Sequence, residues 1–388
     1  MPVPRLDEHS LRIPFNGSPR PTLGVELELQ LIDPRTMNLT SASPQIFERL
    51  GESDRIKQEL TQSTVEVITG VCDNVREVRA DLTASMRKLY EVTDEIGVAI
   101  SSAGTHPFAQ WREQQVFPNE RYSHLVERIQ WPARRLLIYG LHVHVGISSG
   151  EKAIAIGNAL TTYLPHVLAL SASSPFVDYE DTGLASARSK IFEGMPTAGL
   201  PYRLANWGEF QKFMNALIRA DAIQSVREIW WDIRPHPNFG TIEVRVCDCP
   251  STLWETCALT ALIQCLVVYL DHLYDEGVDF PLLQPWIVRE NKWRAVRFGL
   301  DADIINDNTG QQRPLRDDLD RLLDALDEWA DGCGCRDELH LVRRMLEEGP
   351  SYERQRRLYD EHRSFLPVIQ QLTRDLRDDV FSGVDTPA

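Results

Sequence analysis

Hydrophobic and polar residues alternate with a period of two in four short parts of the chain. These segments span residues 23–31, 64–69, 137–147 and 241–247. In the first, the residues at odd positions are Leu or Val, whereas Gly, Glu and Gln occupy the even positions. Such alternation predicts strands whose one face packs on a core while the other meets polar surroundings, which is typical of antiparallel sheets.

Helical spacing fills much of the chain between and after these strands. Residues 75–90 and 153–170 each predict a helix, and Leu319, Leu322, Leu323 and Leu326 form an i, i+3, i+4, i+7 stripe. From about Pro285 onward the pattern is helical and charged, with a surface loop expected at 301–313. We therefore expect an α+β fold in which an antiparallel sheet is backed by helices and followed by a helical C-terminal region.

The length and composition indicate one globular catalytic domain over residues 1–388. We expect a sheet-bearing core at 20–285 and a helical region at 286–388. The chain has 41 Lys and Arg against 57 Asp and Glu, a formal charge of −16, and its 43% hydrophobic content is too high for a disordered chain. The acidic balance argues against nucleic-acid partners and against an anionic membrane surface.

The N-terminal residues show no secretory signal pattern, and the seven cysteines are an odd number for a disulfide framework. Reduced thiols in a cytoplasmic protein are therefore expected. The longest apolar stretch, 257–270, is too short to cross a bilayer and predicts a buried helix or a subunit contact, which leaves a homodimer open. The pairs Cys333/Cys335 and Cys247/Cys249 lack CxxC partners, so we interpret them as core thiols.

The chemistry lies on the polar faces of the four strands. One such face alone is usually solvated, but all four lack Lys and are rich in carboxylate and imidazole, which together favour a site. Glu26 and Glu28 point to the same side of one strand, where like charges need a cation between them. Mg²⁺ prefers oxygen ligands and keeps positions open for phosphates. The residues on these faces are Glu26, Glu28, Glu66, His142, His144, Glu243 and Arg245.

Individual roles follow from residue type. Glu26, Glu28, Glu66 and Glu243 suit a hard cation. His144 could be a further ligand or a phosphate contact, with a hydrogen-bonded structural role as the alternative, whereas a structural role is favoured for His142. Arg245, beside Glu243, suits stabilisation of a transferring phosphoryl group, with a cross-strand ion pair as the alternative.

Two further arginines could reach the same cleft. They are Arg234 and Arg188, although loop exposure is the alternative for Arg188 and for the neighbouring Lys190. The chain has no GxxxxGK[ST], GxGxxG or GxSxG motif, so a bound nucleotide would be held by metal ions and arginines.

These segments resemble the type 2 glutamate–cysteine ligase family, in particular its YbdK-type carboxylate–amine ligases. The resemblance runs from about residue 20 to about residue 300 and continues more weakly beyond. The motifs that carry it are TLGVELE at 22–28, ELTQSTVE at 59–66, GTHPF at 104–108, NERY at 119–122, HVHVG at 142–146, WDIRP at 231–235 and FGTIEVRV at 239–246.

The resemblance implies a glutamine-synthetase-like fold, in which a curved antiparallel sheet forms a half-funnel that holds ATP and Mg²⁺. It also implies a reaction. ATP phosphorylates the γ-carboxylate of L-glutamate, and an amine such as L-cysteine then displaces phosphate to form an amide. Leu27 stands where many relatives have a third acid, but it faces the apolar side, so no loss of metal binding is expected.

By position, the resemblance assigns a role to each candidate residue. Glu243 and Arg245 are implied to be catalytic, and His144, Arg188, Arg234 and Arg245 to contact nucleotide or substrate. The implied metal ligands are Glu26, Glu28, Glu66, His144 and Glu243.

Two other functions remain open. A metal-dependent hydrolase could use the His142-x-His144 pair, although strand faces rich in Glu disfavour zinc. A non-catalytic ATP-binding protein could also be built on the ligase fold.

Overall fold

The computed structural model describes residues 12–381, and within this range the protein is built around a seven-stranded antiparallel sheet. The strand order is β2-β3-β1-β5-β9-β8, and β4 pairs with the C-terminal end of β1. Its strands are β1 (Leu23–Ile32), β2 (Ile56–Gln58), β3 (Thr64–Ile68), β4 (Ala99–Ser101), β5 (Leu141–Gly146), β8 (Ile233–His236) and β9 (Thr241–Val244). All four alternating segments are therefore strands of one sheet.

Two of the four strands are shorter than the alternation predicts. β5 begins at Leu141 because Tyr139 donates its backbone N–H to the Gly104 carbonyl instead of joining the strand ladder. β9 ends at Val244, after which the backbone N–H of Arg245 bonds the Asp232 carbonyl. Alternation marks the faces of a strand, but the hydrogen bonds at its ends depend on distant segments.

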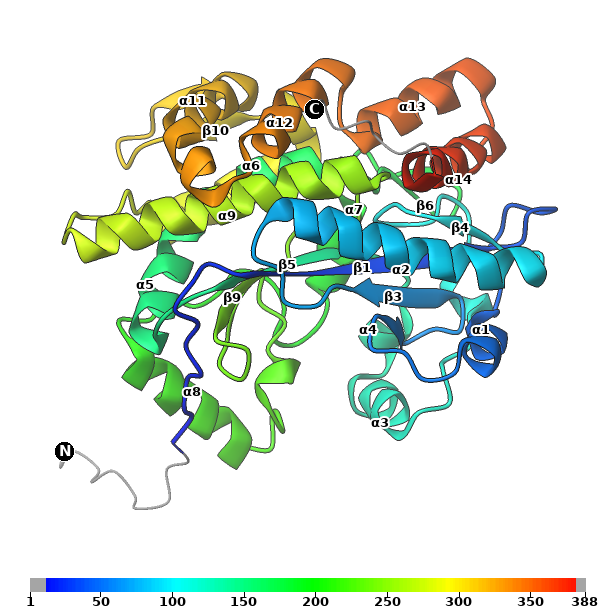
Figure 1. Cartoon of the computed structure of the whole chain (residues 1–388), viewed down its shortest axis with the longest axis horizontal. Helices are drawn as coiled ribbons and strands as arrows, with labels where there is room; N and C mark the ends of the chain where they lie inside the picture. The colour runs from blue at the N-terminus through cyan, green and yellow to red at the C-terminus, as the bar shows by residue number, and fades with distance from the viewer. Residues whose placement is uncertain (1–11, 382–388) are drawn as a thin grey trace.

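Helices cover the apolar face of the sheet, and further helices form an outer layer over them (Figure 1). α2 and α9 lie on the sheet, α11 to α14 lie beyond α9, and α3 and α8 flank the opposite side (Figure 1). The helices are α1 (Ser43–Leu50), α2 (Val75–Glu95), α3 (Glu120–Ile129), α4 (Trp131–Arg134), α5 (Gly150–Leu160), α6 (Leu164–Ser171), α7 (Ala187–Phe192), α8 (Trp207–Arg219), α9 (Leu253–Asp275), α10 (Pro285–Phe298), α11 (Leu315–Cys333), α12 (Arg336–Glu348), α13 (Ser351–His362) and α14 (Leu366–Phe381).

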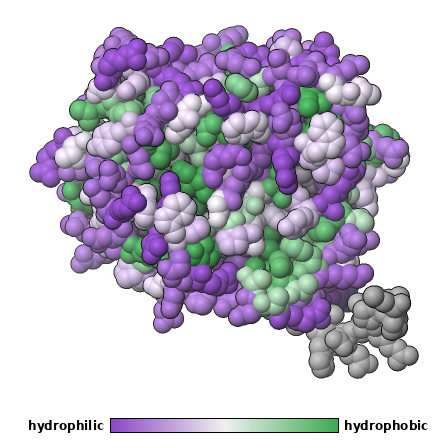
Figure 2. Space-filling model, turned by 180° about the vertical axis from the view of Figure 1, so that it is seen from behind, coloured by the Kyte–Doolittle hydropathy of each residue, from purple (hydrophilic) through white to green (hydrophobic). Residues whose placement is uncertain are grey.

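The core lies between the sheet and α2 and α9. Leu27 and Leu29 of β1 and Val143 of β5 are buried in it, together with Leu82 of α2 and Leu262 of α9. The rear of the molecule is covered mostly by hydrophilic residues (Figure 2). The sheet thus has one face in the core and one face free to carry chemistry.

The apolar stretch at 257–270 is the middle of α9, which is longer than the stretch suggested. Its 23 residues are enough by length and composition to span a membrane, so the expectation that it is too short is wrong. However, 89% of its most apolar window is buried inside the protein, against the sheet and the helices around it. Its place is therefore that of a core helix.

The helix expected at 153–170 is two helices, α5 and α6, whose axes differ by 68°. Pro165 lies in the first turn of α6, where its missing N–H costs nothing, whereas in the interior of a longer helix it would break a hydrogen bond. Hydrophobic spacing continues across this break, so the pattern alone does not reveal it.

The chain after Pro285 is helical, as expected, but the loop expected at 301–313 contains a small hairpin. Its strands are β10 (Asp303–Ile305) and β11 (Gln312–Pro314), and a second hairpin is formed by β6 (Phe176–Val177) and β7 (Glu180–Asp181). Ile304 and Ile305 are buried, which explains why this segment pairs rather than remaining an open loop.

Candidate active site

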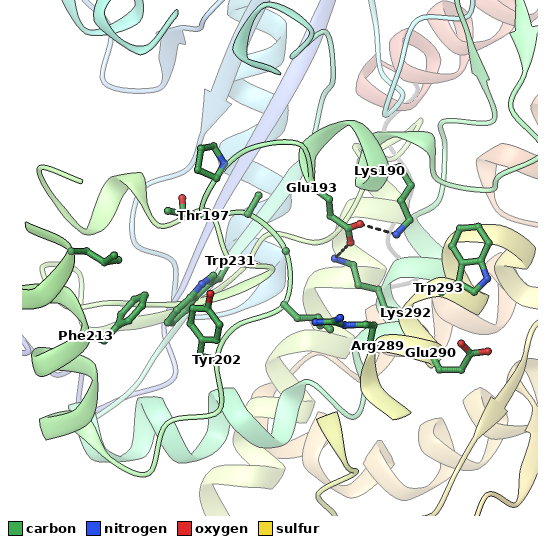
Figure 3. Close-up of a pocket in the computed structure, with 15 residues that line it drawn as sticks. Lys190, Glu193, Thr197, Tyr202, Phe213, Trp231, Arg289, Glu290, Lys292 and Trp293 are labelled. Carbon is green, nitrogen blue, oxygen red and sulfur yellow. Dashed lines mark hydrogen bonds and ion pairs between the residues drawn. The ribbon is translucent and has the colours of Figure 1, made fainter. Parts of the chain in front are cut away.

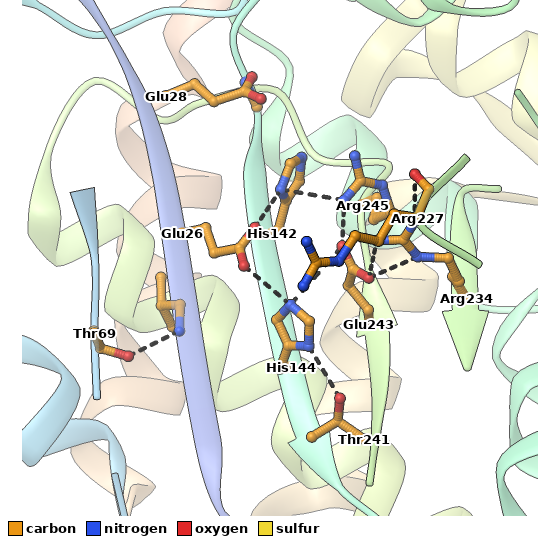
Figure 4. Close-up of polar contacts among 12 residues, drawn as sticks. Glu26, Glu28, Thr69, His142, His144, Arg227, Arg234, Thr241, Glu243 and Arg245 are labelled. Carbon is orange, nitrogen blue, oxygen red and sulfur yellow. Dashed lines mark hydrogen bonds and ion pairs between the residues drawn. The ribbon is translucent and has the colours of Figure 1, made fainter. Parts of the chain in front are cut away.

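The strand register brings the polar side chains of four strands together on the free face of the sheet. Glu28 of β1 is opposite Glu66 of β3, and Glu26 is opposite His142 of β5. On the other side of β5, His144 is opposite Glu243 of β9, which in turn is opposite Arg234 of β8. Residues far apart in sequence therefore form one continuous polar surface (Figure 4).

Two groups on this surface have ligand atoms close enough to share a cation. The first group is Glu26, His142 and Glu243, and the second is Glu28, Glu66 and His142. Within each group, all the ligand atoms lie within 4.8 Å of one another. His142 belongs to both groups, although sequence reasoning favoured a structural role for it. The sequence did contain a sign that His142 belongs with the other candidates, because residues 142 and 144 lie on the same face of a strand.

Glu26 lies between the two histidines of β5. Its carboxylate is 2.9 Å from His142 Nδ1 and 3.4 Å from His144 Nε2. Burial opposes its ionisation, but the hydrogen bonds from these histidines hold the pKa of Glu26 well below its usual value. Thr241 fixes the His144 ring through Nδ1 at 3.0 Å, which leaves Nε2 directed at the carboxylates.

Glu243 is fully buried and is held by two arginines. Arg234 donates to it from Nε at 2.8 Å and Nη2 at 2.6 Å, and Arg245 donates from Nη1. Burial opposes ionisation, but Arg234 and then Arg245 lower the pKa of Glu243 strongly. A carboxylate in this environment stays charged at any ordinary pH.

The two arginines differ in what else they bind. Arg234 Nη1 donates to the backbone carbonyls of Val226, Arg227 and Ile229, so its guanidinium is occupied by Glu243 and by this turn. Arg245 Nε has no hydrogen-bond partner among the described residues. The geometry therefore makes Arg234 a support for Glu243 and leaves Arg245 with donor capacity for a ligand.

The other half of the face carries carboxylates that form no direct ion pair among the described residues, although Arg121 and Arg245 lie near enough to Glu59 and Glu66 to act on their pKa values. Glu66 has no hydrogen-bond or ion-pair partner among the described residues, and burial together with Glu59 raises its pKa well above the usual value. Burial and the charge of Glu28 raise the pKa of Glu59 to about 7. Glu59 was missed as a site residue because it precedes the alternating strand, although it begins the motif at 59–66.

Arg188 reaches the same region from α7. Its guanidinium is buried and donates to the carbonyls of Val246 at 3.2 Å and Arg245 at 3.3 Å. It packs so closely on Gly140 that a Cβ there would lie 2.2 Å from Arg188 Nη2. The Gly140 N–H also donates to Glu28 at 2.6 Å, so this glycine joins the arginine to the carboxylates.

A separate hollow of about 680 Å³ lies between α7, α8 and α10 (Figure 3). Tyr202, Phe213 and Trp231 line one side of it, and charged residues line the other (Figure 3). Lys292, almost fully buried there, bonds Asp232 at 2.6 Å and Glu193 at 2.7 Å. The candidate residues of the sheet face do not line this hollow, but Trp231 and Asp232 immediately precede β8.

Comparison with known proteins identifies the family of the chain. Residues 22–372 match the model of glutamate–cysteine ligase family 2. Two curated relatives carry the name "Putative glutamate–cysteine ligase 2". The one from Thermobifida fusca is 47% identical and aligns over 95% of this chain and 94% of its own length. The one from Gloeobacter violaceus is also 47% identical, over 94% of this chain and 100% of its own length.

Solved structures share the fold at much lower identity. A glutamate–cysteine ligase from Francisella tularensis, crystallised in complex with AMP, aligns with a TM-score of 0.72 at 14% identity, over 96% of this chain and 91% of its own. A bifunctional glutathione synthetase from Pasteurella multocida aligns with a TM-score of 0.69 at 13% identity, over 93% of this chain and 53% of its own. The glutamine-synthetase-like architecture expected from the sequence is thereby confirmed. The chain belongs to glutamate–cysteine ligase family 2 and is a ligase that forms carbon–nitrogen bonds.

Proposed function

We propose that the protein is a cytoplasmic, ATP- and Mg²⁺-dependent carboxylate–amine ligase that joins the γ-carboxylate of L-glutamate to an amine such as L-cysteine. One observation carries this proposal. Glu28, Glu59 and Glu66, which form no direct ion pair among the described residues, share a surface with Arg245, which Glu243 holds in position. A cation and a phosphate between them would satisfy both sides.

The carboxylate set fits Mg²⁺. Burial raises the pKa values of Glu66 and Glu59, and the neighbouring carboxylates raise them further, an effect that a bound cation would offset. Hard cations take oxygen ligands, which Glu26, Glu28, Glu66 and Glu243 supply, with Glu59 beside them. Bound Mg²⁺ would supply neutralisation of phosphate oxygens during phosphoryl transfer.

The arginines of the chain serve the transferred group. Arg245 is held through Nη1 by Glu243, so its orientation is set before substrate arrives, and fixed charges stabilise a transition state without reorganisation. Arg234 maintains Glu243 in place, and His144 Nε2 is directed toward the same carboxylates. Arg188 supports the backbone of Arg245 and Val246 from behind.

The proposed reaction has two steps. A γ-carboxylate oxygen of glutamate attacks the γ-phosphorus of ATP, which releases ADP and leaves an acyl phosphate. The amine nitrogen then attacks the acyl carbon, phosphate leaves with the bonding pair, and the nitrogen loses a proton. The adenine nucleotide is supported by the AMP complex of the Francisella ligase.

The two other functions receive less support. The His142 and His144 rings both contact Glu26, and Thr241 bonds His144 Nδ1, so the pair is embedded in carboxylates rather than set apart for zinc. A protein that only binds ATP would not need the paired Arg245–Glu243 arrangement. Tightly held zinc would favour the hydrolase, and nucleotide binding without turnover would favour the binding protein.

An acceptor screen tests the proposal. The full chain is incubated with ATP, Mg²⁺, L-glutamate and a panel of amines that includes L-cysteine, and amide products are detected by mass spectrometry. Product that requires both ATP and Mg²⁺ is expected for at least one amine, and it should be lost in Glu66→Gln. Glu91→Gln, an exposed change on α2, is the matched control and should retain activity. Absence of phosphate release with every amine would contradict the proposal.

A further inference from the structure

Three of the seven cysteines gather on the opposite side of the sheet from the carboxylates. Cys265 lies in α9, Cys333 is the last residue of α11, and Cys335 is the N-cap of α12. Gly334, with a φ of 64°, makes the left-handed turn between the last two. This turn brings Cys335 Sγ to 3.6 Å from Cys265 Sγ.

The three thiols differ in access. Cys265 and Cys335 are fully buried, whereas Cys333 is half-buried and is therefore the thiol that a solute can reach. Hydrogen bonds from Cys265 and then from Cys335 lower the pKa of the Cys333 thiol, which favours its thiolate at neutral pH. The thiolate is the form that attacks a disulfide.

We propose that these three residues form a thiol–disulfide relay, in which Cys333 exchanges with a low-molecular-weight disulfide and the bond is passed to Cys265 and Cys335. Cys333 thiolate attacks the small disulfide and releases one thiolate, which leaves a mixed disulfide. Cys265 then attacks the Cys333 sulfur and releases the second small thiolate. Finally Cys335 attacks the Cys265 sulfur, which regenerates the Cys333 thiolate. Two protein thiols are oxidised, and one small disulfide is reduced to two thiols.

The geometry suits this product. Sulfur atoms 3.6 Å apart are in contact, and a disulfide needs about 2 Å, so only a small displacement is required. The new bond would join α9, which packs on β5 and α2, to the α11–α12 turn across a sequence separation of 70 residues. A cross-link over such a long loop restricts the unfolded chain and stabilises the fold.

Other cysteines lack these features. Burial raises the pKa of each of the thiols of Cys247, Cys249 and Cys257 to about 12. The pKa values of the Cys265 and Cys335 thiols are raised as well, so Cys333 alone of the cluster has thiolate character, and Cys265 and Cys335 are set apart by their mutual contact. All seven cysteines, which lie in the described part of the chain, are free thiols in this structure. The relay therefore starts from a reduced cluster, and its selectivity comes from the access and the thiolate character of Cys333.

The test uses the reduced full-length protein and oxidised glutathione as the probe. We expect an intact mass lower by two hydrogen atoms, a peptide map that joins Cys265 to Cys335, and a melting temperature higher by about 5 °C that a reductant reverses. Cys333→Ser, at a half-buried position, should slow oxidation by at least about tenfold because the accessible thiolate is lost. Cys335→Ser should accumulate disulfides that involve Cys333, and Cys72→Ser is the control that should match the native protein.

Three results would overturn the relay. The first is oxidation of Cys333→Ser at the native rate. The second is a native protein that keeps a stable glutathione adduct and forms no internal disulfide. The third is a reduced protein that retains stoichiometric zinc on the three thiols, because the cluster would then be a metal site. Ligase turnover is not among the readouts, so the outcome does not depend on the proposed reaction.

Discussion

At the scale of single residues, the polar face has two halves. In one half the carboxylate of Glu243 is paired with arginines, and in the other the carboxylates form no direct ion pair among the described residues. Glu243 is paired with two arginines and stays ionised, whereas burial, and after it the charge of neighbouring carboxylates, raises the pKa values of Glu66 and Glu59. Glu243 is neutralised by its arginines, whereas Glu66 forms no direct ion pair among the described residues. We propose that a cation binds beside Glu66 and that Arg245, whose Nε has no hydrogen-bond partner among the described residues, faces it.

Replacement of Arg245 tests its role in phosphoryl transfer. Arg245→Ala should lower kcat by on the order of 10²–10³, because a fixed charge on the transferring group is lost. Glu243 keeps Arg234 as a partner in this variant, so the fold should survive. Arg49→Ala, an exposed change on α1, is the control. Steady-state kinetics with unchanged kcat in Arg245→Ala would remove the assigned role.

His106 gives the protein a specific sensitivity to acid. Its buried ring bonds the Met37 carbonyl at 2.9 Å through Nε2 and accepts the Ala109 N–H through Nδ1, and burial lowers its pKa from 6.5 to about 4. Between pH 6.5 and pH 4, His106 is therefore protonated in the unfolded chain but neutral in the folded chain. The contribution of neutral His106 to the free energy of unfolding is fully present above pH 6.5 and is lost as the pH falls toward 4, a loss of about 3 kcal/mol.

Denaturant unfolding between pH 7 and pH 4 measures this contribution. His106→Gln should show a loss of stability across that range smaller by about 3 kcal/mol than the native chain, because the titrating ring is gone. His124→Gln, on the exposed side of α3, should follow the native pH dependence. Parallel curves for the native and His106→Gln proteins would show that His106 does not titrate as described.

Much of this candidate site was predictable from the sequence, because alternate residues of a strand point to the same face of the sheet. A period of two assigns Glu26, Glu28, Glu66 and Glu243 to one face without knowledge of the fold. The sharing of His142 between two groups, and the place of Glu59, depend on which strands are neighbours and on a turn outside any strand. Those facts are set by long-range pairing, which alternation does not encode.

At the scale of elements, α9 is the central helix of the core. It lies against α2, α5, α11 and α12 and against β5, and its residues are buried on every side over most of its length. This explains why its sequence has no polar face. The sequence pattern predicted the helix and its burial but underestimated its length, because the polar residues at its ends are also helical.

A cavity in α9 should be costly. Leu262→Ala removes a fully buried side chain and should lower the free energy of unfolding by about 2–5 kcal/mol. Leu366→Ala makes the same change in α14 at a side chain that is 47% exposed, and it should cost less than about 1 kcal/mol. Chemical denaturation of both variants checks the contrast, and equal losses would mean that α9 is not the centre of the core.

At the scale of the whole molecule, the sheet-bearing core and the helical region after residue 285 share one interior. Leu319 of α11 and Val380 of α14 belong to the same hydrophobic cluster as the strands. Arg79 of α2 makes a two-pronged ion pair with Asp379 of α14, and Arg354 of α13 bonds Glu255 of α9 at 2.6 Å. From these contacts we propose that the described residues form one domain, as the sequence predicts.

Calorimetry of the full chain tests this unity. We expect a single cooperative unfolding transition, because loss of the C-terminal helices would expose α9 to water. A chain that ends at residue 285 should accordingly fail to give a cooperative transition. Two resolved transitions in the full chain, or a stable fragment 12–285, would show that the region is an independent domain.

The net charge of −16 also has its meaning at this scale. It argues against nucleic-acid polymers, but it says little about a mononucleotide, because the few carboxylates on the sheet face would be neutralised by metal ions. In the proposed function, the local charge after metal binding determines which ligand is held, and the proposed acyl-phosphate route depends on this local charge. A direct test of that route is therefore a test of the whole account.

The most direct measurement follows oxygen from glutamate to phosphate. L-glutamate labelled with oxygen-18 in its γ-carboxylate is incubated with ATP, Mg²⁺ and the amine found in the acceptor screen, and the released phosphate is analysed by mass spectrometry. The account predicts one labelled oxygen in each phosphate for every amide formed, because the acyl phosphate transfers it. Amide formation with unlabelled phosphate would contradict the γ-glutamyl phosphate and with it the role of the carboxylate–arginine face.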